Sequence, residues 1–136
     1  MVDASVAVKW VIAEEHSALA DALSDRQMSA PSLLLVECAN ALLRRVRAGE
    51  IPAQALPGKV RALRLAPVRL VPTERHLEGA VALATQLRHS LYDCLYLALA
   101  LDERAPLVTA DQRFVEAVRR HGALAGAVAL LAETAR

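Results

Sequence analysis

The stretch Ser90-Leu91-Tyr92-Asp93-Cys94-Leu95-Tyr96-Leu97-Ala98-Leu99-Ala100-Leu101 is almost continuously apolar and carries one carboxylate near its start. Leu and Ala are strong helix formers, so the stretch predicts a buried helix. Aspartate is seldom buried without a partner. Ser90 or Asp93 could cap the helix by accepting backbone N–H bonds. Alternatively, Asp93 could belong to a functional site, and the rest of the sequence bears on this choice.

Length and composition set limits on the class of protein. A chain of 136 residues has a usual size for one domain, and we expect residues 1–136 to form a single domain. The net charge of +1 gives no global basic field of the kind that marks many nucleic-acid binders. Cys38 and Cys94 lie within apolar segments, as is typical of core thiols in a reduced compartment. No run of about 18 residues is free of charges, and Met1-Val2-Asp3 has no basic region that leads into an apolar one. We therefore expect neither a membrane span nor a signal peptide, and a cytoplasmic location.

Hydrophobic periodicity and turn residues predict alternating short strands and helices. Residues 6–12 fit either a strand or a short helix. Pro57 and Gly58 are expected to interrupt the helix in which they lie. We expect helices over 16–23, 32–48, 53–65, 73–88, 90–101 and 112–120, and strands over 27–30, 67–72, 105–109 and 127–131. This alternation predicts an α/β sandwich with a mostly parallel sheet.

Four carboxylates stand out by their positions: Asp3, Glu37, Asp93 and Asp111. Asp3 follows the first short strand, Asp111 follows the strand of residues 105–109, and Glu37 lies in the middle of an apolar helix. Each also has a structural interpretation. Asp3 and Asp111 could be N-caps, and Glu37 could point outward or pair with an arginine. The other acids, Glu14 and Glu15 among them, lie in mixed polar surroundings and are predicted on the solvated surface.

The expected topology favours a shared site for these four acids. Ligands bind beyond the carboxyl ends of strands in open parallel sheets, where Asp3 and Asp111 would both lie. The helices that carry Glu37 and Asp93 could bring two more carboxylates there. Clustered acids repel each other, and a hard divalent cation such as Mg²⁺ or Mn²⁺ relieves that repulsion with oxygen ligands. Such a site can activate water and stabilise charge on a phosphodiester.

Four segments of the chain, in this order and spacing, resemble the PIN-domain proteins of the VapC type. These proteins are the toxin half of bacterial toxin–antitoxin pairs, and the resemblance covers nearly the whole chain. The segments are Val2-Asp3-Ala4-Ser5-Val6, Val36-Glu37-Cys38-Ala39-Asn40-Ala41-Leu42, Ser90-Leu91-Tyr92-Asp93-Cys94-Leu95-Tyr96-Leu97-Ala98 and Thr109-Ala110-Asp111-Gln112-Arg113-Phe114.

The resemblance implies a three-layer α/β/α sandwich with a parallel sheet of about five short strands, and a metal-dependent endoribonuclease. It places Mg²⁺ or Mn²⁺ on Asp3, Glu37, Asp93 and Asp111, with Ser5, Asn40 and Thr109 as supporting polar residues. It also implies a homodimer, a small antitoxin as partner, and structured RNA such as tRNA as substrate. Only Met1 and Val2 precede Asp3, whereas the family usually has a longer first strand, so that strand is expected to be very short or the chain begins late.

Basic residues supply candidates for contact with RNA. The arginines that could contact backbone phosphates, or form an ordinary solvated face, are Arg44, Arg45, Arg47 and Arg113. His16 and His89 are predicted to be surface histidines rather than proton shuttles, because a metal site of carboxylates needs neither.

Two other functions are compatible with a sheet edge lined by acids. A receiver-like signalling module also places carboxylates around Mg²⁺, but it needs a late lysine, and no lysine follows Lys59. A non-catalytic PIN-like domain that only binds a partner is the second alternative. Loss of an acid would indicate it, and all four acids are present.

Overall fold

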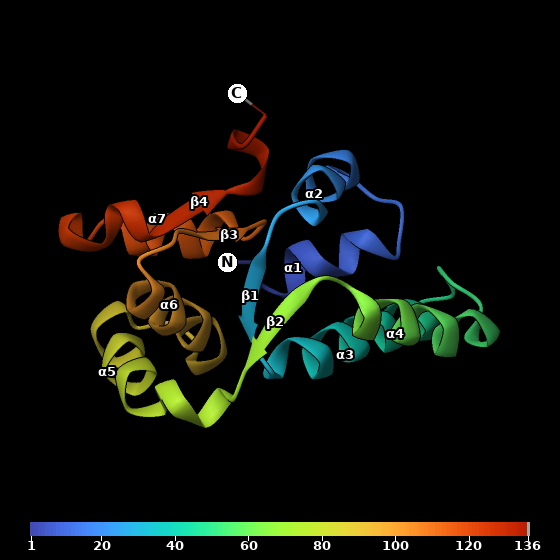
Figure 1. Cartoon of the computed structure of the whole chain (residues 1–136), viewed down its shortest axis with the longest axis horizontal. Coiled ribbons are helices and arrows are strands. Elements are labelled where there is room, and N and C mark those ends of the chain that lie inside the picture. The colour runs from blue at the N-terminus through green and yellow to red at the C-terminus, as the bar shows by residue number, and fades with distance from the viewer. Residues whose placement is uncertain (136) are drawn as a thin grey trace.

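The computed structural model describes residues 1–135 as short strands connected by helices (Figure 1). The α-helices are α1 (Ala4–Ala7), α2 (Ser17–Ser24), α3 (Leu33–Arg47), α4 (Leu56–Leu65), α5 (Leu77–Leu87), α6 (Leu91–Glu103) and α7 (Gln112–Arg119). The strands are β1 (Met28–Pro31), β2 (Val68–Val71), β3 (Leu107–Thr109) and β4 (Val128–Leu130). The short 3-10 helices are η1 (Val8–Trp10), η2 (Ala53–Ala55), η3 (Thr73–His76), η4 (Gly122–Ala127) and η5 (Leu131–Glu133).

The strands form two parallel pairs that are joined by the second residue of the chain. β1 pairs with β2 from Met28↔Val68 to Pro31↔Val71, and β3 pairs with β4 from Leu107↔Val128 to Thr109↔Leu130. Val2 forms a parallel bridge with Val108, whose amide donates to the Met1 carbonyl at 2.9 Å. On its other side, the Val2 amide donates to the Ser29 carbonyl at 3.3 Å. A first strand reduced to a single bridge thus lies between β3 and β1.

Helix α6 is the most deeply buried helix of the core. Every residue from Cys94 to Ala100 is buried, with Tyr96, Leu97 and Leu99 at most 1% exposed. The helix packs on α5 and contacts β1 and β3. Figure 1 shows α5 and α6 on one side of β1 and β2, and α1, α3 and α4 on the other. This arrangement confirms the buried helix and the α/β class with parallel strands that the sequence predicts.

Several expected elements differ in detail from the structure. Residues 6–12, which fit either a strand or a helix, are largely helical, in α1 and η1. Pro57 and Gly58 do not interrupt a helix, because Pro57 lies in the first turn of α4, where its missing N–H has no intrahelical partner to lose. The start of the predicted helix over 73–88 is the 3-10 helix η3. No helix within residues 1–135 is long and apolar enough to cross a membrane.

Two glycines provide a matched test of the local backbone. Gly49 follows α3 with φ of +73°, whereas Gly58 lies in the first turn of α4, and a Cβ at either would meet nothing within 4 Å. We expect Gly49→Ala to lower the free energy of unfolding by about 1 kcal/mol, because L-residues are strained at positive φ. Gly58→Ala should raise it by about 0.5–1 kcal/mol, because alanine loses less entropy in a helix. Urea denaturation of both variants and wild type measures these changes in the free energy of unfolding. Equal changes in the two variants would contradict the backbone conformations given for Gly49 and Gly58.

Candidate functional site

The four carboxylates singled out in the sequence line one pocket of about 370 Å³. They come from four separate parts of the chain: the start of α1, the middle of α3, the first turn of α6 and the start of α7. The residues that share the pocket wall with Asp3, Glu37, Asp93 and Asp111 include Ser5, Lys9, Glu14, Arg44, Arg45 and Tyr96. The fold therefore brings the predicted acids together.

Asp3 is held at the entrance of α1 by hydrogen bonds to one of its oxygens. Its Oδ1 accepts from the Val6 amide at 3.2 Å, which makes it the N-cap of that helix, and from the Ser5 hydroxyl at 2.6 Å. Its side chain is buried, with the residue only 7% exposed. The capping interpretation and the placement in the pocket are therefore both correct for this residue.

Asp111 has the same arrangement at the start of α7. Its Oδ1 accepts from the Phe114 amide at 3.0 Å, and its own amide donates to Thr109 Oγ1 at 3.0 Å. Thr109 Oγ1 lies 3.3 Å from Ser5 Oγ, which also accepts from the Ala110 amide at 2.8 Å. These contacts connect the end of β3 to the start of α1, and they hold Asp3 and Asp111 at the same edge of the sheet.

Asp93 is a pocket residue and not the cap of its helix. Ser90 is the N-cap of α6, because its hydroxyl oxygen accepts from the Asp93 amide at 3.1 Å. The Ser90 hydroxyl also donates to Asp93 Oδ2 at 3.0 Å. These two hydrogen bonds orient the carboxylate at the first turn of α6.

Glu37 has a tyrosine as its hydrogen-bond partner. The Tyr96 hydroxyl donates to Glu37 Oε1 at 2.7 Å, while no arginine within residues 1–135 forms an ion pair with Glu37. Tyr96 is 1% exposed, so the bond joins the core of α6 to the pocket face of α3. The sequence interpretation missed this residue, although Tyr96 lies three positions after Asp93 and so shares its helix face.

Burial and mutual repulsion act on the carboxyl groups of the pocket. The pKa of Asp3 is raised to about 6, chiefly by burial and to a smaller extent by the negative charge of Asp93, while hydrogen bonds from Ser5, Thr109 and Val6 oppose the rise. Burial also raises the pKa of Glu37 and of Asp93. The charge of Asp93 adds to the rise at Glu37, and that of Asp111 adds to the rise at Asp93. Asp93 is thus electrostatically coupled to the other three acids.

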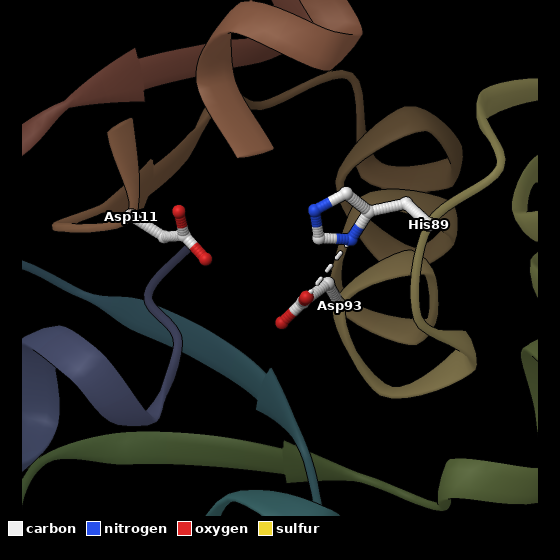
Figure 2. A group of neighbouring side chains, drawn as sticks. All are labelled: His89, Asp93 and Asp111. Atoms are coloured by element: carbon white, nitrogen blue, oxygen red, sulfur yellow. Dashed lines mark ion pairs between the residues drawn. The ribbon is translucent and has the colours of Figure 1, made fainter. Parts of the chain in front are cut away.

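The donor set fits a hard divalent cation. Within residues 1–135, no lysine or arginine forms an ion pair with any of the four carboxylates. Oxygen ligands are what Mg²⁺ and Mn²⁺ prefer. Within the described residues, His89, Asp93 and Asp111 each offer a possible ligand atom, and these atoms all lie within 4.8 Å of one another. Figure 2 shows these three side chains facing a common space.

Two predictions about surface residues are wrong. His89 is not a surface histidine, because its side chain is only 22% exposed and its Nδ1 lies 3.1 Å from Asp93 Oδ2. Glu14 is not a solvated acid: it lines the pocket, pairs with Lys9 at 2.8 Å and also pairs with Arg45. Both errors arise because contacts between distant segments leave no local pattern in the sequence. His16, by contrast, has a side chain that is 39% exposed, as predicted.

The remaining candidate residues divide clearly by position. Arg44 lines the pocket and forms no ion pair within residues 1–135. Arg45 also lines it but pairs with Glu50 at 2.9 Å as well as with Glu14. The residues that are exposed and do not line the pocket are Asn40, Arg47 and Arg113. Asn40 therefore lies outside the pocket wall, and its supporting role stays a prediction.

Comparisons with known proteins identify the family of the chain. The sequence model of the PIN domain matches residues 1–119. The chain is 33% identical over 121 residues to Ribonuclease VapC1 of Mycobacterium tuberculosis, in strains H37Rv and CDC 1551 / Oshkosh, covering 86% of this chain and 89% of that protein. The chain therefore belongs to the PIN-domain family, as a protein of the VapC type.

The raised pKa of Asp3 predicts how stability depends on pH in the metal-free protein. A carboxyl group whose pKa is about 6 when folded and near 4 when unfolded stabilises the fold while protonated, and this contribution is lost as the pH rises through 6. Asp3→Asn keeps an acceptor for the Val6 amide and stays neutral. We expect its stability relative to wild type to fall by about 2 kcal/mol between pH 7.5 and pH 4.5.

Urea denaturation in the presence of a chelator at both pH values measures this difference. Asp21→Asn is the matched control, because Asp21 is exposed on α2 and does not line the pocket. If the difference in the free energy of unfolding between Asp3→Asn and wild type did not change with pH, burial would not raise the pKa of Asp3 as described.

Proposed function

We propose that the acidic pocket is the active site of a metal-dependent endoribonuclease that acts as the toxin of a toxin–antitoxin pair. The observation that carries the proposal is the convergence of Asp3, Glu37, Asp93 and Asp111 on one pocket. Membership of the PIN family and the likeness to proteins called Ribonuclease VapC1 support the same activity. Hydrolysis of a phosphodiester bond in RNA is the reaction that such a site would perform.

The four acids would hold Mg²⁺ or Mn²⁺. The chemistry that a bound divalent cation supplies is polarisation of the scissile phosphate and a lower pKa for the attacking water. The chain's own contribution is positioning. Ser90 orients Asp93, Tyr96 orients Glu37, and Ser5 orients Asp3 through hydrogen bonds of 3.0, 2.7 and 2.6 Å. These bonds hold the carboxylates in place before substrate arrives, as preorganised catalysis requires.

Arg44 is the best-placed residue for contact with the RNA backbone. It lines the same pocket as Glu37 and lies about two helical turns further along α3. Its charge is not neutralised by an ion pair, unlike that of Lys9 or Arg45. An arginine in this position can bind a phosphate bidentately next to the reacting bond.

The partners proposed for this chain come from its family. We propose a small antitoxin that blocks the pocket, a homodimer as the active species, and structured RNA such as tRNA as the substrate, all in the cytoplasm. A purified complex with the product of a neighbouring reading frame, and the RNA ends that form after induced expression, would test the antitoxin and the substrate.

Asp93→Asn tests the active site directly. We expect it to lower the rate of Mn²⁺-dependent RNA cleavage by about a hundredfold or more, because Asp93 is electrostatically coupled to all three other acids. The fold should persist, because Ser90 still caps α6 and asparagine removes a repulsive charge. The assay compares purified proteins on total RNA with Mn²⁺ and with a chelator, together with circular dichroism.

Asp102→Asn on the exposed side of α6 is the control and should cleave like wild type. If wild type showed no metal-dependent cleavage, the nuclease proposal would fail. Equal cleavage by Asp93→Asn would instead remove Asp93 from the active site.

Arg44→Gln tests the contact with phosphate. We expect a several-fold loss of RNA affinity, about 1 kcal/mol, and a salt dependence of binding that is smaller by about one counterion. Arg47→Gln is the matched control, because Arg47 is an exposed arginine of the same helix that does not line the pocket. Binding is measured by fluorescence anisotropy at several salt concentrations with a cleavage-inactive background. Equal losses in the two variants would mean that Arg44 acts only through general charge.

A further inference from the structure

His89 occupies the turn between α5 and α6, next to the acidic pocket. Arg88 ends α5 in the left-handed conformation, with φ of 51°, and the chain turns there before Ser90 caps α6. The imidazole ring lies against the ring of Phe114, with centroids 4.7 Å apart and an angle of 45°. Phe114 is the residue whose amide is capped by Asp111. The start of α7 therefore positions both the Asp111 carboxylate and the imidazole of His89.

The ring nitrogen nearest to Asp93 has no hydrogen bond. Nδ1 of His89 is buried and lies 3.1 Å from Asp93 Oδ2, but the geometry between them is not that of a hydrogen bond. Figure 2 shows the ring pointing into the space between the carboxylates of Asp93 and Asp111. A buried ring nitrogen without a hydrogen bond costs free energy, and a cation in this space would accept the lone pair of the imidazole.

The spacing of the three groups suits shared coordination. Their ligand atoms lie within 4.8 Å of one another. Two ligands on opposite sides of an ion at about 2.1 Å would lie about 4.2 Å apart, so small side-chain movements suffice. Asp3 and Glu37 line the same pocket but are not members of this group of three.

We propose that His89 is a nitrogen ligand of the metal ion held by Asp93 and Asp111. This proposal rests on the proposed function, because it concerns the same metal site. Carboxylates alone suit Mg²⁺ and Mn²⁺, whereas imidazole suits later first-row ions. The mixed donor set therefore raises the affinity of this site for an ion such as Co²⁺ relative to Mg²⁺.

Metal binding by the full-length protein, without RNA, tests the proposal. Co²⁺ and Mg²⁺ are titrated separately, Co²⁺ by its visible absorption and both by calorimetry. His89→Phe keeps a ring against Phe114 but removes both nitrogens. We expect it to lose roughly ten- to hundredfold in Co²⁺ affinity, as is typical for groups that support a bound metal, and much less in Mg²⁺ affinity. His121→Phe is the control, because His121 does not line the pocket.

The outcomes separate this proposal from the nuclease proposal. Failure of wild type to bind either ion would overturn both. Unchanged or tighter Co²⁺ binding by His89→Phe would overturn the ligand role alone, and tighter binding would identify His89 as a competing cation beside Asp93. If His89→Phe does not fold, NMR spectra of wild type with and without Co²⁺ test the proposal instead. We expect Co²⁺ to shift the ring-proton signals of His89 far more than those of His121. Equal shifts would overturn the proposal.

Discussion

Mutual repulsion among carboxylates in one pocket is the constraint on which the arrangement of this protein depends. Three of the four acids lie at helix N-termini, where unpaired backbone N–H groups favour negative charge: Asp3 and Asp111 as caps, and Asp93 in the first turn of α6. Glu37, in the middle of α3, lacks that support and accepts a hydrogen bond from the buried Tyr96 instead. The residual cost of burial is visible in the raised pKa values of Asp3, Glu37 and Asp93.

The basic side chains of the pocket do not form ion pairs with the four acids of the proposed metal site within residues 1–135. Lys9 and Arg45 both pair with Glu14, and Arg45 also pairs with Glu50, so these cations are neutralised by acids outside the proposed metal site. Arg44 alone among the pocket-lining cations of the described chain has no ion pair. The four acids would attract a metal ion, and the unpaired Arg44 lies beside them. Together the metal ion and Arg44 would allow a phosphodiester to bind although the phosphodiester and the acids are all negatively charged.

The sheet edge that carries the acids depends on very few residues. Met1 and Val2 connect the β1–β2 pair to the β3–β4 pair, because the Met1 carbonyl accepts from Val108 and the Val2 amide donates to Ser29. Directly after them, Ser5 and Thr109 connect the start of α1 to the end of β3 through hydroxyl contacts. The short first strand therefore does not misplace Asp3, because side-chain hydrogen bonds complete the connection that a longer strand would make with its backbone.

The sequence by itself determined the class of fold, most of the elements and the four acids. Those signals are local. They are apolar periodicity, a proline or glycine at the end of a helix or strand, and a carboxylate that directly follows a strand or lies in an apolar helix. Only the tertiary structure decided what surrounds the acids. The placement of His89 on Phe114, the bond from Tyr96 to Glu37 and the pairing of Glu14 with Arg45 join residues that are 25, 59 and 31 positions apart. Such contacts follow from packing of the whole chain, which no local pattern of residues encodes.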